Sequence, residues 1–206
     1  MIICNLAVLL AERQLKITRI SNDTGISRTT LTSLKQNDAK GIQFDTINTL
    51  CNYLLVEPKD FFDYSPLDFS VKFSFSENAI EFDYDYAVDS EQTKGIPLGV
   101  NIDGFLSCIT PKGNETIELS INLSTKGNIF RSNQFLINCE LASKNDKINF
   151  SKIISQLSIP LKTELRNQIG NSLKNFLHEK ENSEYISEYF DWKKENITEQ
   201  YNIDLF

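Results

Sequence analysis

The sequence predicts an α+β protein, in which an all-α domain over residues 1–66 precedes an antiparallel β-sheet domain with C-terminal helices over residues 67–206. Two observations carry this prediction. Apolar residues recur at helical spacing as far as Tyr64-Ser65-Pro66. Beyond that point they alternate with polar residues, which is the period of a strand with one buried face. A length of 206 residues gives each domain enough chain to bury a core.

Five helices are expected in the first domain. The first covers residues 5–13 and turns three leucines inward, namely Leu6, Leu9 and Leu10. Two helices follow within 16–36, and a fourth covers 45–55 with Ile47, Leu50, Cys51 and Leu54 on its inner face. A last short helix over 57–62 starts at Pro58, because proline suits the first helical position.

The stretch 16–36 predicts two helices that meet at a sharp turn. Gly25 lies at the junction, where a residue without a Cβ tolerates positive φ. Ser27 suits the N-cap of the second helix, which buries Leu31 and Leu34. Its outer face presents short hydrogen-bonding side chains and cations: Arg28, Thr29, Thr32, Ser33 and Lys35. Such a face is typical of a helix that reads the major groove of DNA.

Residues 5–62 resemble the Cro/CI-like, or XRE-type, helix-turn-helix domain of phage repressors and bacterial regulators. Four segments carry the resemblance in order: DTGISRTTL from Asp23, GI from Gly41, TINTLC from Thr46 and PKDFF from Pro58. The resemblance implies recognition-helix contacts from Arg28, Thr29, Thr32 and Ser33, and contacts to the DNA backbone from Lys35 and Gln36.

The chain departs from the family at two places. Ile17 stands where the family often has a glutamine that braces a phosphate, so that contact is absent or is supplied by Thr18. The segment 37–40 stands where the family often has an Asn-Gly turn. It ends in Lys40, a cation expected near the proposed groove together with Arg28 and Lys35.

Charge indicates which domain approaches DNA. Residues 1–66 hold seven basic and seven acidic side chains, so this domain alone is expected to bind DNA weakly. Local cations and a second copy would both strengthen the binding. Beyond residue 66 there are 14 basic and 21 acidic side chains, and the excess negative charge argues that only the first domain contacts phosphates.

In the second domain a hairpin is expected over 69–88, with a turn at Glu77-Asn78-Ala79. Further antiparallel strands are expected at 98–109, 116–124 and 134–143, with turns at 111–114 and 126–128. The helical period returns at Ser151. A helix starting near Ser158 and Pro160 is expected to cover the apolar face of the sheet through Leu161, Leu165, Ile169, Leu173, Phe176 and Leu177. A last helix is expected over about 183–195, and the tail 201–206 stays unassigned.

Two rows of side chains in the expected hairpin leave alternatives open. The acidic row Glu81, Asp83 and Asp85 is interpreted as a solvated strand face, with a metal site or a mimic of nucleic-acid phosphate as alternatives. The aromatic row Phe82, Tyr84 and Tyr86 is interpreted as core packing, with a ligand pocket as the alternative.

Several functional classes are disfavoured. The four cysteines are scattered without a CxxC pair, and the one histidine, His178, has no partner pattern for nucleophilic catalysis, so no enzyme, metal site or cofactor is expected. Buried free thiols suit a reducing cytoplasm. No segment is long and apolar enough to span a membrane, and the first thirteen residues lack the features of a signal peptide.

The sequence therefore predicts a cytoplasmic, sequence-specific transcriptional regulator that binds a double-stranded DNA operator, as a dimeric repressor of phage or mobile-element type. The second domain is the candidate for dimerisation, with 160–178 and 185–192 as surfaces, and for binding a protein, peptide or small-molecule effector. Two alternatives remain open: a phage-borne inhibitor of host defence, similar to anti-CRISPR proteins, or an antitoxin. In both, the helix-turn-helix would regulate the protein's own gene.

Overall fold

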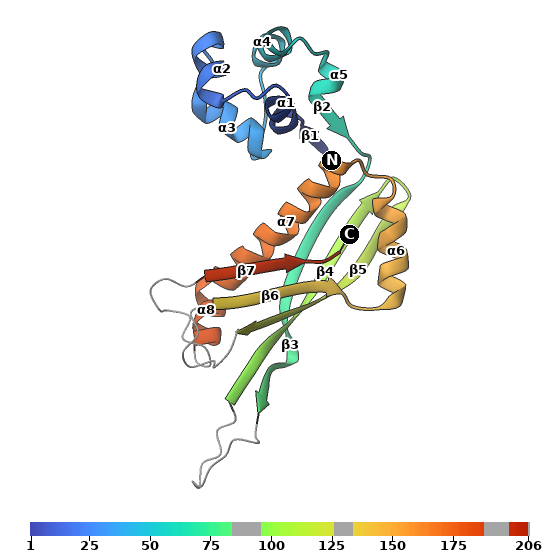
Figure 1. Cartoon of the computed structure of the whole chain (residues 1–206). Helices are drawn as coiled ribbons and strands as arrows, with labels where there is room; N and C mark the ends of the chain where they lie inside the picture. Colours follow the sequence, from blue (N-terminus) through green and yellow to red (C-terminus); the bar gives the residue numbers. More distant parts are fainter. Residues whose placement is uncertain (84–95, 126–133, 188–197, 206) are drawn as a thin grey trace. The chain divides into compact units, whose positions relative to one another are not determined.

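A computed structural model describes residues 1–83, 96–125, 134–187 and 198–205 (Figure 1). The chain divides into two compact units, Met1–Pro66 with Leu157–Glu164, and Leu67–Gln156 with Leu165–Phe206. The fold class is α+β, as predicted, because helices come first and a mostly antiparallel sheet with further helices follows.

The first 66 residues contain the five expected helices: α1 (Leu6–Glu12), α2 (Ile17–Thr24), α3 (Arg28–Gln36), α4 (Phe44–Leu54) and α5 (Pro58–Phe61). Each of them contributes to one buried cluster, which contains Leu6, Leu9, Leu10, Ile20, Leu31, Leu34, Leu50, Cys51, Leu54 and Phe61. The expected inward faces are therefore confirmed, apart from Ile47, which is only partly buried. Every member of this cluster precedes residue 66, so the core of the helices is complete within that segment.

Two short strands close this helical unit and were not expected. β1 (Ile2–Cys4) pairs antiparallel with β2 (Phe62–Tyr64). The amino group of Met1 donates to the carbonyl of Ser65 at 2.7 Å, and the Ser65 amide donates to the Met1 carbonyl at 2.9 Å. Strands of three residues are too short to show an alternating pattern, which is why the sequence did not indicate them.

The end of α4 carries a backbone conformation that its residue disfavours. Leu55, the C-cap, has φ 53° and ψ 50°, in the left-handed region. Its side chain is 89% exposed, so it contributes little packing. This conformation is about 1–2 kcal/mol less favourable for a residue with a Cβ, whereas glycine adopts it without a clash.

We therefore predict that Leu55→Gly raises the free energy of unfolding by about 0.5–1 kcal/mol, since relief of the backbone strain outweighs the greater entropy of the unfolded glycine chain. Leu55→Ala is the matched control, because it removes the same exposed methyl groups but keeps the Cβ. Urea unfolding of the three proteins measures the difference. Equal stability of the glycine and alanine variants would contradict the prediction.

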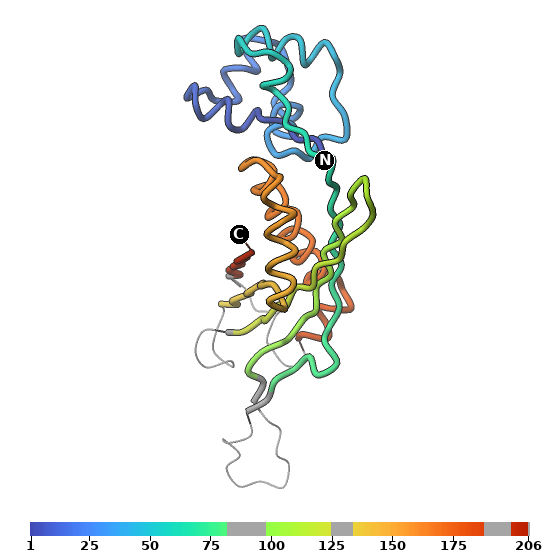
Figure 2. Tube along the Cα trace, turned by 90° about the vertical axis from the view of Figure 1, so that its right-hand side faces the viewer, coloured from blue at the N-terminus to red at the C-terminus, as the bar shows by residue number. Residues whose placement is uncertain are grey.

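The second unit is built on a five-stranded sheet in the order β3-β4-β5-β6-β7. The strands are β3 (Asp68–Asp83), β4 (Ile96–Thr110), β5 (Gly113–Thr125), β6 (Gln134–Leu141) and β7 (Thr198–Ile203). The three long strands β3, β4 and β5 run side by side in both views (Figure 2). The strands expected at 98–109, 116–124 and 134–143 are thus confirmed to within a few residues.

The prediction of a hairpin over 69–88 with its turn at 77–79 is wrong. β3 runs without a turn through the residues assigned to one, and a register shift takes its place: Phe75 pairs with Ile102, and Ile80 pairs with Val100. The turn-forming residues before Ala79 form this irregularity, and Ala79 is itself buried. The remainder of the expected hairpin, including Tyr84, Asp85 and Tyr86, lies outside the described residues, as does the turn at 126–128.

The last strand, β7, contains the first three residues of the unassigned tail, and its pairing corrects the expectation of a purely antiparallel sheet. β7 runs parallel to β6, with Gln134 opposite Thr198 and Cys139 opposite Ile203. A parallel pair requires a long crossover, and the helices between β6 and β7 supply it.

Three helices follow β6: α6 (Lys144–Ile154), α7 (Ile159–His178) and α8 (Lys180–Ser187). α6 begins seven residues before Ser151, where the helical period was expected to return, because Ser143 caps it by accepting from the Asp146 amide at 3.1 Å. The expected stripe on α7 is buried at Leu161, Leu165, Ile169, Leu173 and Leu177. The expected helix 183–195 is α8 as far as Ser187, and the rest lies outside the described residues.

α7 covers the apolar face of the sheet, as expected. The ring of Phe176 lies 5.9 Å from that of Phe73 and 5.3 Å from that of Phe75, centroid to centroid. The same face of the sheet buries Ile102, Leu106, Ile117, Leu119, Ile121 and Ile137.

All four cysteines are free and buried, as expected. Burial raises the pKa of Cys4 to about 11 and that of Cys139 to about 12, so both thiols stay protonated at neutral pH. Within the described residues, no helix combines the length and apolar character needed to cross a bilayer.

Candidate nucleic-acid interface

The junction between α2 and α3 has the geometry of a sharp helix-helix turn. Gly25 has φ 75°, as expected for a residue without a Cβ, and its amide donates to the Ser21 carbonyl. The Thr24 hydroxyl donates to the Ile20 carbonyl at 2.6 Å and accepts from the Ile26 amide at 3.3 Å. The Ser27 hydroxyl accepts from the Thr30 amide at 3.1 Å, so the predicted N-cap is confirmed.

The buried leucines of α3 show which face of the helix points outward. Leu31 is fully buried and Leu34 is nearly so, which leaves the predicted contact residues on the opposite side. Arg28, Thr29, Thr32, Lys35 and Gln36 are exposed, and Ser33 is half-buried. Arg28 is the first residue of the helix, where the unpaired amides also favour an anion. The outer face therefore offers hydrogen-bonding groups that no core contact uses.

The cations near this face have no acidic partner. Among the described residues, neither Arg28, Lys35 nor Lys40 forms an ion pair within 4.0 Å. Lys59, by contrast, lies 2.6 Å from a carboxylate oxygen of Glu57. Unpaired cations can neutralise phosphates without first losing an internal partner.

A hollow of about 560 Å³ joins α3 to the segment that leads into α4. Thr29 and Ser33 line one side, and Lys40 lines the other. The structure thus brings three of the eight predicted contact residues together in this hollow, and the other five do not line it: Thr18, Arg28, Thr32, Lys35 and Gln36. Thr18 is exposed on α2.

Sequence reasoning missed two residues of the same hollow, Gln43 and Thr46. Gln43 is the N-cap of α4, and its side chain makes no capping hydrogen bond. The first amides of α4 are therefore available to an anion such as a phosphate. Gln43 precedes the apolar pattern of α4, and this position at a helix start is the signal that could have identified it.

α2 is tied to α4 behind the turn. The Tyr53 hydroxyl donates to Oδ2 of Asp23 at 2.6 Å, and Nε of Arg19 lies 3.6 Å from the same oxygen. The hydrogen bond to Asp23 raises the pKa of Tyr53. At the far end of α3, Asn37 adopts φ 57° and its Oδ1 accepts from the Cys4 amide at 2.6 Å. These bonds hold both ends of the helix pair.

The acidic row predicted in the second unit is described only in part. Glu81 is exposed, and its Oε1 accepts from Nδ2 of Asn101 at 2.8 Å. Asp85 lies outside the described residues. Where the structure is described, no group of three or more His, Cys, Asp or Glu side chains is placed to hold a metal ion.

Comparison with known proteins agrees with this geometry. The family model of the Cro/C1-type HTH DNA-binding domain matches residues 5–66. YozG of Bacillus subtilis (strain 168), an uncharacterized HTH-type transcriptional regulator, is 36% identical over 63 residues, which are 31% of this chain and 75% of that protein. No solved structure matches the chain. These matches confirm the resemblance that the motifs indicated, and the family match ends before β3 begins.

Proposed function

Because this chain belongs to the family defined by the Cro/C1-type helix-turn-helix DNA-binding domain, we propose that it is a sequence-specific transcriptional regulator that inserts α3 into the major groove of an operator. The observation that carries the proposal is the outer face of α3, which is exposed, rich in hydrogen-bonding groups and flanked by cations that pair with no acidic side chain in the described part of the chain. Arg28, Thr29, Thr32 and Ser33 are the proposed base-reading residues. Thr18, Lys35, Gln36 and Lys40 are the proposed phosphate contacts.

We further propose that the protein acts as a homodimeric repressor of phage or mobile-element type. A recognition helix of nine residues reads only a few base pairs, so useful specificity requires two copies on a two-fold symmetric site. The absence of net charge in residues 1–66 supports the same requirement, since one copy holds few cations to neutralise phosphates. The predicted second domain, residues 67–206, is the proposed site of dimerisation.

The test begins with an operator selected by the full-length protein from a random DNA pool. We predict that Arg28→Ala lowers affinity for that operator by about 1–3 kcal/mol and relaxes selectivity at one base pair, because arginine pairs with a guanine edge through two hydrogen bonds. Lys35→Ala should weaken binding to all sequences alike and flatten the salt dependence, because it removes one phosphate contact. Fluorescence anisotropy across a salt series measures both effects.

Lys147→Ala is the control for loss of a positive charge, since Lys147 is an exposed residue of α6. It should leave the binding nearly unchanged. If folded Arg28→Ala protein bound the selected operator as tightly as the unaltered chain, the proposed docking of α3 would be wrong.

A further inference from the structure

β7 is an edge strand that no lysine, proline or bulge blocks. Among the described strands none lies beyond it, so one side of its backbone has no partner in the sheet. Natural edges are often blocked by lysine, proline or a bulge. The opposite edge, β3, has Lys72 and a register shift after Phe75. β7, with the sequence TEQYNI, has no lysine or proline, and its register with β6 is unbroken. Its one charged side chain, Glu199, is directed toward α7 and away from the pairing side of the strand.

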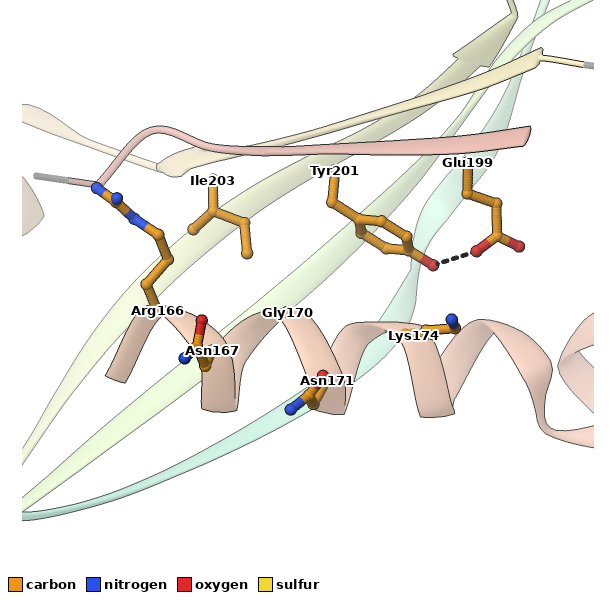
Figure 3. A pocket seen from close by; sticks show the side chains of 8 residues that line it. All are labelled: Arg166, Asn167, Gly170, Asn171, Lys174, Glu199, Tyr201 and Ile203. Atoms are coloured by element: carbon orange, nitrogen blue, oxygen red, sulfur yellow. Dashed lines mark hydrogen bonds between the residues drawn. The ribbon is translucent and has the colours of Figure 1, made fainter. Parts of the chain in front are cut away.

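A groove runs along this edge, between β7 and α7 (Figure 3). Its volume is about 610 Å³, and its polar lining is Arg166, Asn167, Asn171, Lys174, Glu199 and Tyr201. The strand and the helix lie side by side with opposite chain directions in the close view, and Glu199, Tyr201 and Ile203 are all directed toward the helix. Gly170 permits this approach, because a Cβ there would lie 3.0 Å from Cδ1 of Ile203.

The two walls differ in charge. On the strand, the Glu199 carboxylate is already engaged: Nε2 of His178 lies 2.8 Å from one oxygen, and the Tyr201 hydroxyl donates to the other at 2.9 Å. Burial, together with Glu199, raises the pKa of Tyr201, so its hydroxyl keeps this proton. The helix wall presents the cations Arg166 and Lys174. Arg166 also lines an adjoining hollow that contains Glu140 and Asp204, so Lys174 is the cation more available to a ligand.

The spacing of these cations fits an extended chain. Arg166 and Lys174 are eight residues apart on a helix, which corresponds to about 12 Å at 1.5 Å per residue. Residues i and i+4 of a strand are about 13 Å apart and lie on the same face. Positions i and i+4 of a strand placed beside β7 would therefore have nearly the same spacing along the groove as Arg166 and Lys174, and position i+2 would fall between them, at the level of Asn167 and Asn171.

We propose that the free edge of β7 binds an extended peptide segment of a partner protein as an added strand, with acidic side chains at positions i and i+4 and a small polar side chain at i+2. Main-chain hydrogen bonds to β7 would supply much of the affinity, and the α7 cations would select the sequence. This inference does not depend on DNA binding. It specifies the chemical class of the partner that the second unit would bind, namely an extended acidic peptide segment.

The probe is a fluorescein-labelled peptide, Val-Glu-Val-Thr-Val-Glu-Val, mixed with the full-length protein. Anisotropy should show saturable binding. Peptides N-methylated on the amides that face β7 should bind about fivefold more weakly for each blocked hydrogen bond. Equal binding of the methylated peptide would overturn the proposal, because ionic attraction alone would then explain the affinity.

A charge exchange tests the α7 wall. K174E should lower the affinity for the glutamate peptide by about fivefold. A peptide with lysine in place of the second glutamate should regain that affinity on K174E but not on the native protein. K147E is the matched control, since it makes the same change at an exposed lysine outside the groove. Circular dichroism verifies that each variant is folded.

Three further outcomes would overturn the proposal: no saturable binding of the glutamate peptide, equal binding of it by the native protein and K174E, or self-association of the chain that blocks the peptide. The last outcome would assign the β7 edge to a second copy of this chain. Sedimentation velocity with and without peptide distinguishes that case.

Discussion

A chain that ends after Pro66 is expected to stay folded and to bind a selected operator about 10²–10⁴ times more weakly than the full-length protein. The fold should persist because the buried cluster of the five helices draws only on residues before 66. The affinity should fall because two linked recognition helices bind a two-fold operator with a high effective concentration, and separate copies lose that advantage. This result would place the dimerising contacts in residues 67–206.

Three measurements check this expectation. Circular dichroism and thermal unfolding test whether residues 1–66 keep their helices. Sedimentation tests whether the fragment is monomeric where the full chain is dimeric, and anisotropy measures operator affinity for both. Full affinity in the fragment, or a monomeric full-length chain at micromolar concentration, would remove the dimerisation role from the second unit. A fragment that unfolds would instead show that Leu157–Glu164, the later segment of the first unit, is needed for its stability.

The helix-turn-helix was predictable because local rules determine it. Gly25 suits a backbone with positive φ, Ser27 suits an N-cap, and the leucines at 31 and 34 recur at helical spacing. Each of these preferences depends on a few neighbouring residues, so it can be recognised without knowing the rest of the fold. The confirmed burial of Leu31 also determines the exposed side of α3, on which the proposed contacts lie.

The structure of the second unit depends more on contacts between residues far apart in the sequence, and the wrong predictions concern this unit. Glu77-Asn78 has turn-forming residues, yet the pairing of β3 with β4 on both sides keeps the strand continuous. β7 has one short alternating run, and only its pairing with β6 across a long crossover shows that it is a strand. Gln43 was missed for a similar reason, because the hollow that it shares with Ser33 forms only when α3 and α4 are packed.

The largest loss of stability among the point variants considered is expected for Leu31→Ala, at about 2–5 kcal/mol in the free energy of unfolding. Leu31 is fully buried in the helical core, so alanine leaves a cavity that the neighbouring helices can close only in part. The adjacent Thr32 is exposed on the same helix and is a proposed base contact. Thr32→Ala should therefore change stability by less than about 0.5 kcal/mol.

The Leu31→Ala and Thr32→Ala variants should distinguish an effect on stability from an effect on DNA recognition. Urea unfolding measures the first property, and anisotropy at a temperature where both variants are folded measures the second. Thr32→Ala is expected to lower operator affinity while Leu31→Ala, once folded, keeps it, because the buried Leu31 side chain cannot reach the DNA and the exposed Thr32 side chain would contact a base. The reverse pattern, with affinity lost only in Leu31→Ala, would mean that Thr32 does not contact the operator and would count against the proposed docking of α3.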